Sequence, residues 1–560
     1  MNKTLHDSVR MGALEPVIRE AISELEDAHI MRRIWARDHT VWQPDPTEVA
    51  NRLGWLDIME PMMQALPRLE TFVASVRAEG YTKVVWMGMG GSSLAPDVFS
   101  RTFGAAEGYL DLRVLDSTDP GAVKSHTAWV DWGRTLFVVA TKSGTTAETM
   151  SFFKHFYNKT LSRMSMEEAG QQFIAVTDGG SKLHELGEEL GFREIFLNDP
   201  NIGGRFSVLS YFGMVAAVLL GVDVRELLQR ATQMAKACRP EVPVTENPGA
   251  WLGAVMASLA QRGRDKLTFV APEVLVPFGD WVEQLIAEST GKDGTGILPV
   301  VGEAIDEPTH YGEDRLFVYQ RIEDETSLNA EVDALAEADF PVITLSLKDR
   351  EDMGAQFFLW EMATAVAGHL MDIQPFNQPN VEAAKKAAKT FIEEYREKGT
   401  LGAIEYAPLK PEALRSFLAE GSGVVSMAPR PYIAVHAYVQ PTRAADEALQ
   451  AFRATLRRTT GLAVTVGYGP RFLHSTGQLH KGDGGNGFFI QFVSLPEAAE
   501  DVPIPDAPGK DNASISFGVL KIAQALGDFE ALSDAHRNVI RFEVKKDLAT
   551  TVEALLGDSN

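Results

Sequence analysis

Three turns rich in glycine and hydroxyl side chains could bind an anion. They span residues 88–93, 141–146 and 203–207, and the first two directly follow apolar runs. Such a turn exposes backbone N–H groups and hydroxyls at a helix N-terminus, where the helix dipole favours negative charge. Turns that follow neighbouring parallel strands meet at the carboxyl edge of the sheet. We therefore expect the first two turns to share one pocket, and we expect its ligand to carry a phosphate.

The turn at 141–146 carries four hydroxyl side chains in six residues, together with Lys142. Serine and threonine also favour helix N-caps, and Glu148 could complete a capping box with Thr145. Capping uses one or two hydroxyls, so four exceed what it needs. We interpret this turn as a phosphate site that can also cap its helix.

The strongest candidate for acid–base chemistry lies in the helical segment 281–292. Gln284 and Glu288 are four residues apart and share one face of the helix. An isolated glutamate on a helix is most often a solvated surface group, but apolar residues precede Glu288 and a turn of small residues follows it. Partial burial would move its pKa toward neutrality, which suits a general base.

Alternating apolar and helical segments predict the elements that position these groups. Strands are expected at 82–87, 112–115, 136–140, 173–177 and 194–197, with helices between them. A second unit of the same kind spans about 245–397. This alternation is typical of parallel sheets with helices on both faces, so the predicted fold class is α/β.

A change in composition after Gly399 marks a further region, where strands are expected at 432–439, 462–468 and 487–493. We predict an α+β domain there. The predicted organisation is a helical segment at 1–75, αβα domains at 76–240 and 241–398, and the α+β domain at 399–560.

Composition limits the function classes. The 560 residues include 77 acidic and 53 basic side chains, a net charge of −24, which argues against nucleic-acid or anionic membrane partners. The single cysteine, Cys238, excludes an intrachain disulfide, and no Cys/His spacing suggests a metal site. We see no signal-peptide pattern and no apolar run of spanning length, so we expect a cytoplasmic enzyme.

Five motifs together resemble the glucose-6-phosphate isomerase family in kind and order. They are Gly-Met-Gly-Gly-Ser-Ser at 88–93, Thr-Lys-Ser-Gly-Thr-Thr at 141–146, Gly-Gly-Arg-Phe-Ser at 203–207, Glu-Ser-Thr-Gly-Lys at 288–292 and the segment 374–385. The resemblance implies two αβα sugar-isomerase (SIS-type) domains. The flanking regions resemble the isomerase half of bifunctional transaldolase/glucose-6-phosphate isomerase proteins, but no transaldolase-sized segment precedes the motifs, so isomerase activity alone is expected.

The resemblance also implies a role for each matching residue. Glu288 resembles the base that moves a proton between C2 and C1, Arg205 the cation that stabilises the enediolate, and Lys385 a ring-opening residue. The implied phosphate and hydroxyl contacts are Ser92, Lys142, Ser143, Thr145, Thr146, Gln284 and Gln378. The implied partner is a small phosphosugar and the implied assembly can be a homodimer, while the chemistry needs no metal or redox cofactor.

The family's ring-opening histidine usually precedes the last active-site helix, and this chain departs from that pattern. The segment 469–485 is dense in functional residue types and contains His474 and His480. We favour His480 as the ring opener because an imidazole titrates near neutrality, with His474 and His310 as alternatives. The alternative interpretation is that this segment has no catalytic role and forms a contact between subunits.

Two other functions compete with the isomerase. A nucleotide-dependent oxidoreductase would use the 88–93 turn, with Asp116 on the ribose, but it leaves the 141–146 turn unexplained. A phosphosugar-binding regulator without catalysis would keep the phosphate site, yet it would need an effector module of which the sequence gives no sign.

Overall fold

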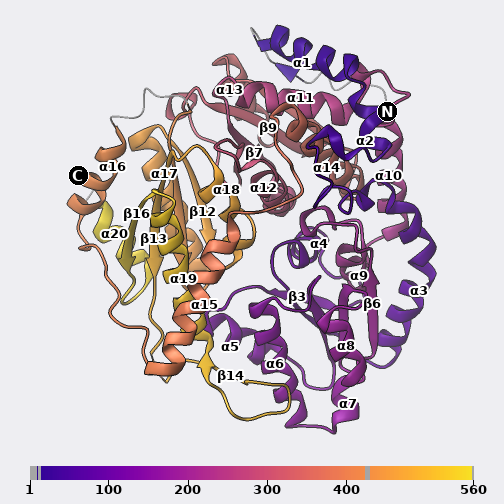
Figure 1. The fold of residues 1–560 in the computed structure, drawn as a ribbon, viewed down its shortest axis with the longest axis vertical. Helices are drawn as coiled ribbons and strands as arrows, with labels where there is room; N and C mark the ends of the chain where they lie inside the picture. The colour runs from indigo at the N-terminus through magenta and orange to yellow at the C-terminus, as the bar shows by residue number, and fades with distance from the viewer. Residues whose placement is uncertain (1–8, 11–13, 423–428, 498, 558–560) are drawn as a thin grey trace.

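Three sheets and the helices around them make up the protein, for which we describe a computed structural model (Figure 1). The structure describes residues 9–10, 14–422, 429–497 and 499–557. In Figure 1 the C-terminal sheet lies on the left, and the two earlier α/β units lie one above the other on the right. In the described part of the chain, no helix is both long enough and apolar enough to cross a membrane.

The first sheet is parallel and confirms the five predicted strands. Its order is β3-β2-β4-β5-β6, so the chain reverses its direction of progress between β2 and β4. All six residues of β4 are buried, as expected for a strand covered on both faces. The strands are β2 (Lys83–Met87), β3 (Asp111–Leu115), β4 (Thr135–Ala140), β5 (Phe173–Asp178) and β6 (Glu194–Asn198). The helices are α4 (Leu94–Phe103), α5 (Pro120–Trp129), α6 (Ala147–Leu161), α7 (Met166–Gly170), α8 (Lys182–Glu189), α9 (Tyr211–Leu220) and α10 (Val224–Ala237).

The second sheet has the order β1-β10-β9-β7-β8 and is parallel except for β1. It has the alternation of strands and helices expected for the second unit at about 245–397. The strands are β7 (Lys266–Val270), β8 (Leu298–Val300), β9 (Arg315–Ile322) and β10 (Val342–Leu347). The helices are α11 (Pro248–Ala260), α12 (Val276–Thr290), α13 (Asn329–Glu337), α14 (Met353–Leu370) and α15 (Val381–Lys398).

The N-terminal segment packs on the second unit before it reaches the first. Strand β1 (Val9–Arg10) pairs with β10, and α1 (Glu15–Asp27) and α2 (Ile30–Trp35) follow, with α3 (Met59–Ala78) leading into β2. Two indole N–H groups anchor the aromatic stretch between α2 and α3: Trp35 donates to the carbonyl of Cys238 and Trp42 to that of Ala365, each at 2.8 Å. This aromatic stretch is therefore a packing element.

The C-terminal sheet corrects one expectation. Its order is β12-β11-β13-β16 and every pair is parallel, so the region alternates strands and helices as an α/β unit instead of the α+β unit predicted. The strands are β11 (Tyr432–Tyr438), β12 (Ala463–Tyr468), β13 (Gly487–Val493) and β16 (Asn538–Glu543), with the small pair β14 (Pro503–Ile504) and β15 (Ile515–Ser516). The helices are α16 (Pro411–Ser422), α17 (Arg443–Thr460), α18 (Gly477–Gly482), α19 (Phe517–Asp534) and α20 (Leu548–Leu556).

The C-terminal unit shares apolar clusters with both earlier units. Ile504 and Phe517 pack in the cluster that holds β4 and α6, and Leu479 packs with Ala287 of α12. Figure 1 shows α15 and α19 side by side between the C-terminal sheet and the first unit. These contacts hold segments 471–482 and 517–528 against the carboxyl edge of the first sheet.

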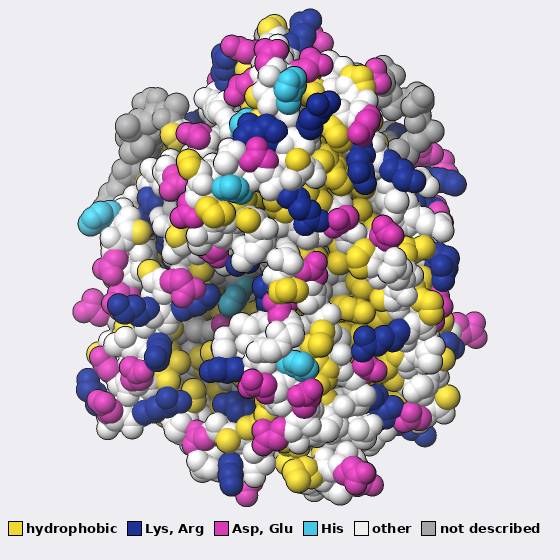
Figure 2. All heavy atoms as spheres, turned by 45° about the vertical axis from the view of Figure 1, so that its right-hand side comes forward, with side chains coloured by type: hydrophobic (Ala, Val, Ile, Leu, Met, Phe, Trp, Pro, Cys, Tyr) yellow, Lys and Arg dark blue, Asp and Glu magenta, His cyan; other side chains and the backbone are white. Residues whose placement is uncertain are grey.

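Charges are interspersed on the face shown in Figure 2, where acidic and basic side chains alternate without a patch of one sign.

The first and third glycine-rich turns touch through their backbones. A Cβ built on Gly91 would lie 2.1 Å from the carbonyl oxygen of Gly204. Only glycine fits there, and its contact fixes the position of Arg205 relative to the first sheet.

We expect Gly91→Ala to separate these turns and to destabilise the fold by about 1–3 kcal/mol, because the methyl group must displace backbone atoms. Gly179→Ala is the control, since a Cβ there meets nothing within 4 Å. Thermal unfolding of the two variants measures the difference. Equal unfolding temperatures would show that the contact between the turns has no influence on stability.

Candidate active site

A cavity of about 500 Å³ opens beside the 141–146 turn, within the usual size range of small-molecule sites. Its walls come from the N-terminus of α6, from α15, from the segment 473–481 and from α19. The strand ends before the first two turns are neighbours, as expected, because β2 pairs with β4, but no residue of the first turn lines this cavity, so the pocket that the two turns were expected to share is not seen here. The cavity thus lies at the reversal point of the first sheet.

The hydroxyl groups of the second turn face this cavity. Ser143, Thr145 and Thr146 line it, and the Ser143 and Thr145 side chains are exposed with their oxygens 2.7 Å apart. The Thr146 hydroxyl pairs with that of Thr141 at 3.0 Å. Thr146 is the N-cap residue of α6, but no side-chain bond caps the helix, so its N-terminal N–H groups stay available to an anion.

The capping role predicted for Glu148 is wrong, because its side chain points to other partners. The buried Glu148 Oε1 accepts hydrogen bonds from Gln524 Nε2 at 2.6 Å and pairs with His474 Nε2 at 3.1 Å. Burial alone would raise the pKa of Glu148, but the charge and hydrogen bond of His474 bring it below its ordinary value. Glu148 is therefore an ionised partner that orients the His474 ring at the cavity wall.

Glu288 sits in the last turn of α12, which is buried along most of its length. Its side chain is 11% exposed. Burial raises the pKa of Glu288, and the positive charges of Arg205, His474, Lys292 and Lys385 oppose that shift. Gln284, one turn before Glu288 on α12, donates to the carbonyl of His474, which lines the cavity, so this end of α12 lies near the cavity, although Glu288 is not itself one of the lining residues.

Arg205 joins the third turn to α12 and to the turn before α15. Its side chain is 3% exposed, and Nη1 lies 3.3 Å from Glu288 Oε2. The other acceptors of its N–H groups are Ser289 Oγ at 2.8 Å, Gln378 Oε1 at 3.0 Å, and the carbonyls of Asn377 at 3.0 Å and Pro375 at 2.5 Å. All five N–H groups are therefore used.

Three more of the predicted residues lie at this site. Lys385 lines the cavity from α15, and its Nζ lies 2.9 Å from Glu382 Oε1. Gln284 donates to the carbonyl of His474 at 2.6 Å, while its own buried Oε1 has no partner. Gln378 reaches the site through Arg205. Together these contacts bring Gln284, Glu288, Arg205, Gln378 and Lys385 around one region.

Three predicted residues lie elsewhere. Lys142 turns away from the cavity, because its Nζ pairs with Asp178 and donates to the carbonyl of Pro200 at 2.9 Å. Ser92 belongs to the first turn but does not line the cavity. The preference for His480 conflicts with its placement: it is 1% exposed and its Nδ1 faces His436 at 3.2 Å.

His474, one of the two alternatives, is the histidine that lines the cavity. The other, His310, is paired with Asp306 at 3.1 Å, and it is also absent from the cavity wall. The sequence alone could not separate these histidines, because His474 and His480 lie in the same segment, 469–485, only six positions apart.

The dinucleotide interpretation of the first turn is also contradicted by geometry. Backbone atoms of Gly204 occupy the approach to Gly91 that a pyrophosphate would need. Asp116, expected on a ribose, instead pairs with Arg471 at 3.2 Å and is buried. Neither feature leaves room for a nicotinamide cofactor at this turn.

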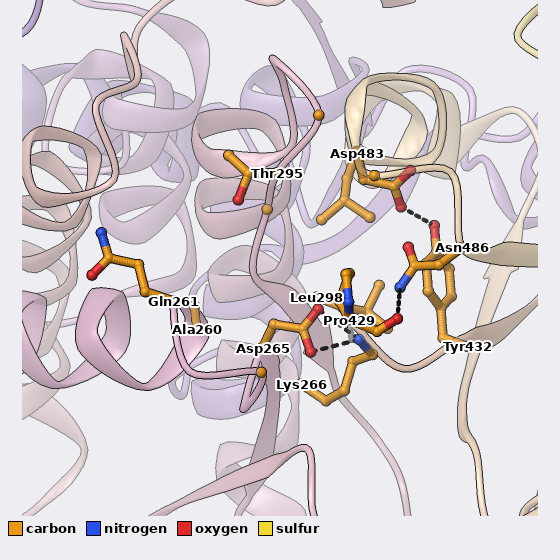
Figure 3. A pocket seen from close by; sticks show the side chains of 15 residues that line it. Ala260, Gln261, Asp265, Lys266, Thr295, Leu298, Pro429, Tyr432, Asp483 and Asn486 are labelled. Atoms are coloured by element: carbon orange, nitrogen blue, oxygen red, sulfur yellow. Dashed lines mark hydrogen bonds and ion pairs between the residues drawn. The ribbon is translucent and has the colours of Figure 1, made fainter. Parts of the chain in front are cut away.

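A second pocket, between the second unit and the C-terminal unit, has a different character (Figure 3). Its polar side chains already bind one another: Lys266 pairs with Asp265 at 2.6 Å, and Tyr432 donates to Asp483 at 2.8 Å. None of the glycine-rich turns reaches it. The cavity beside the 141–146 turn is therefore the candidate active site.

Sequence reasoning missed Glu148, Gln524 and Lys481 in this site. The sequence around Glu148 fits a capping box. The only signal against capping was the apolar character of the strand before it and of its own helix. Gln524 and Lys481 belong to a unit whose packing against the first sheet no local pattern predicts. Their position follows from the shared apolar clusters.

Two α/β units with a hydroxyl-lined cavity at the edge of the first sheet are the arrangement that the resemblance to phosphosugar isomerases implies. The family model "Phosphoglucose isomerase" matches residues 48–309. Over this range the chain is similar to the glucose-6-phosphate isomerase family.

Among its relatives are two named glucose-6-phosphate isomerases. The protein from Prochlorococcus marinus is 28% identical over 428 residues, which cover 70% of this chain and 80% of that protein. The protein from Methanocaldococcus jannaschii is 28% identical over 350 residues, 56% of this chain and 85% of that one.

Two solved structures share the fold. The hypothetical protein TT0462 from Thermus thermophilus superposes with a TM-score of 0.59 at 22% identity, over 68% of this chain and 98% of that one. A glucose-6-phosphate isomerase from Chlamydia trachomatis gives 0.52 at 21% identity, over 73% and 88%.

The placement of His474 predicts that His474→Ala lowers kcat for a closed-ring hexose phosphate by about 10²-fold or more, the usual worth of an acid–base group. His310→Ala is the control, because His310 lies outside the cavity and should leave kcat unchanged. Steady-state rates of purified variants give the answer. A normal rate for His474→Ala would exclude this side chain from ring opening.

Proposed function

We propose that the chain interconverts glucose 6-phosphate and fructose 6-phosphate by acid–base chemistry at the cavity beside the 141–146 turn. One observation carries this proposal: a buried carboxylate, Glu288, faces a buried guanidinium, Arg205, next to a cavity lined by hydroxyl groups. The match to the phosphoglucose isomerase model and the similarity to relatives named glucose-6-phosphate isomerase support the same reaction. A regulator that only binds the sugar would not need this desolvated pair of a carboxylate and a guanidinium.

In the proposed reaction the phosphate binds Ser143, Thr145 and the free N–H groups of α6. Hydroxyls and a helix N-terminus together suit a dianion. His474, held by Glu148, moves a proton from the anomeric hydroxyl to the ring oxygen as the bond between C1 and the ring oxygen breaks, and Lys385 assists from α15. The sugar ring opens and exposes the carbonyl carbon beside C2.

Glu288 then removes the proton from C2 and returns it to C1. One carboxylate can serve both carbons because they are neighbours on one face of the substrate. Burial raises the pKa of Glu288, which makes it a stronger base than a solvated glutamate. The 11% exposure of this side chain leaves limited access to water, so a fraction of the transferred protons exchanges with solvent.

Arg205 stabilises the negative charge that develops on the enediolate oxygen. Its N–H groups are all occupied, so its field acts from a fixed position, as in other preorganised sites. A substrate oxygen can also replace the amide of Gln378, which is exposed. The other bonds would keep the guanidinium in place during that exchange.

Every residue named in this proposal belongs to a single copy of the chain. We propose a cytoplasmic enzyme that acts on a small phosphosugar, and a homodimer would be compatible with this arrangement.

The central prediction concerns Glu288→Gln. This variant should lose about 10³-fold or more in kcat and stop exchanging the C2 proton with solvent, while it still binds substrate. Glu283→Gln on the same helix is a matched control: burial raises the pKa of Glu283 to about 8, so it is neutral at pH 7 and glutamine imitates it. Exchange followed by NMR in D2O separates the two. Full turnover by Glu288→Gln would remove it as the base.

The raised pKa of Glu288 also predicts a pH profile. The base must be ionised, so kcat should fall as the pH drops through its folded pKa, which lies above the ordinary 4.5. We expect the acidic limb of the profile above pH 4.5. A limb at or below 4.5 in the wild-type enzyme would contradict the burial of this carboxylate.

A further inference from the structure

The segment 469–485 brings a second cation to the cavity besides His474. Lys481 lies on α18, lines the cavity, and has a side chain that is only 3% exposed. A buried ammonium group carries a large cost unless it is paired and hydrogen-bonded. The hydrogen-bond partners of Lys481 therefore indicate its role.

A single carboxylate pairs with Lys481. Its Nζ donates to Asp528 Oδ1 at 2.6 Å, and the other oxygen, Oδ2, lies 3.1 Å from His436 Nδ1. Asp528 is fully buried on α19, yet the charge of Lys481 and the bond from His436 hold its pKa well below the ordinary range. Asp528 is thus an ionised group fixed from both sides.

His480 completes this arrangement from behind. Burial lowers the pKa of both His436 and His480, so both rings are neutral. His436 Nδ1–H then donates to Asp528, and its Nε2 accepts from His480 Nδ1–H at 3.2 Å. The order His480, His436, Asp528, Lys481 forms one continuous chain that ends at the cavity. His480 thereby positions the lysine through two intermediate groups.

A comparison with other buried lysines shows what distinguishes Lys481. Lys292 donates to three oxygens, and Lys521 donates to Asp119 and Ser494. Lys266 contacts both oxygens of Asp265. Lys481 has one acceptor among the described residues, although an ammonium has three N–H donors. Among these four, Lys481 is the lysine that lines the cavity of the proposed site.

We propose that Lys481 is a further substrate-binding residue, which donates to an oxygen of the bound phosphosugar while Asp528 positions it. This inference rests on the proposed function, since it uses the same cavity. A hydrogen bond from a charged donor contributes about 10- to 100-fold in affinity. The C-terminal unit would then supply both an acid–base group, His474, and a binding cation.

Binding is best measured in a Glu288→Gln background, where turnover does not disturb the titration. We expect Lys481→Met to raise the Kd for glucose 6-phosphate about 10- to 100-fold by calorimetry, and Lys481→Arg to retain most of the affinity. Competition by inorganic phosphate identifies the contact. A parallel loss of phosphate affinity places Lys481 on the phosphate, and an unchanged phosphate affinity places it on a sugar hydroxyl.

Lys521→Met is the matched control. Lys521 is equally buried and paired with a buried aspartate, but it does not line the cavity, so the Kd should stay within about threefold. Where Lys481→Met fails to fold, Lys481→Met combined with Asp528→Asn removes the uncompensated charge and serves as the test variant. An unchanged Kd, or an equal loss in Lys521→Met, would overturn the proposal.

Wild-type turnover separates this inference from the proposed function. If the wild-type chain binds glucose 6-phosphate but does not isomerise it, the proposed reaction is wrong, whereas the Kd of Lys481→Met still decides the role of Lys481. If turnover is normal and the Kd is unchanged in Lys481→Met, the reaction stands and only this inference fails.

Discussion

The buried ion pair between Arg205 and Glu288 is the interaction on which the site depends. A carboxylate at this depth would be neutral without a cation beside it, and a guanidinium would be costly to bury without acceptors for its N–H groups. Here five acceptors meet the five donors, and they come from α12 and from the turn before α15. The pair therefore holds the first and second α/β units in one relative position.

This constraint explains the close contact of the glycine-rich turns. Arg205 can reach α12 only if the third turn lies directly against the first, and the absence of a side chain at Gly91 allows that approach. The C-terminal unit closes the same region from the other side, because Gly291 at the end of α12 leaves room for Leu479 of α18. The two small residues let three units meet around one carboxylate.

The sequence was sufficient for the local parts of this arrangement. Periodicity predicted the strands of the first sheet within a few residues, and motif order indicated Glu288 and Arg205. It was insufficient wherever the outcome depends on contacts between units. Glu148 satisfies the pattern of a capping box, but its carboxylate instead contacts His474 and Gln524, which lie more than 300 residues away. The parallel pairing of β16 with β13 joins residues 50 positions apart, such as Phe488 and Asn538, which no local pattern predicts, so an α+β unit was expected there.

The same reasoning explains why His474 and His480 have different surroundings although they are only six positions apart. His474 ends the short 3-10 helix Arg471–His474 at the cavity, where its Nε2 lies 3.1 Å from Glu148 Oε1. His480 lies in α18 and faces the interior of the C-terminal unit, where a neutral ring is the stable form. In a chain of net charge −24, the buried carboxylates Glu148 and Asp528 hold His474 and Lys481 at the cavity. In the proposal made above, the affinity for a phosphosugar therefore depends partly on Asp528, an acidic residue that does not line the cavity.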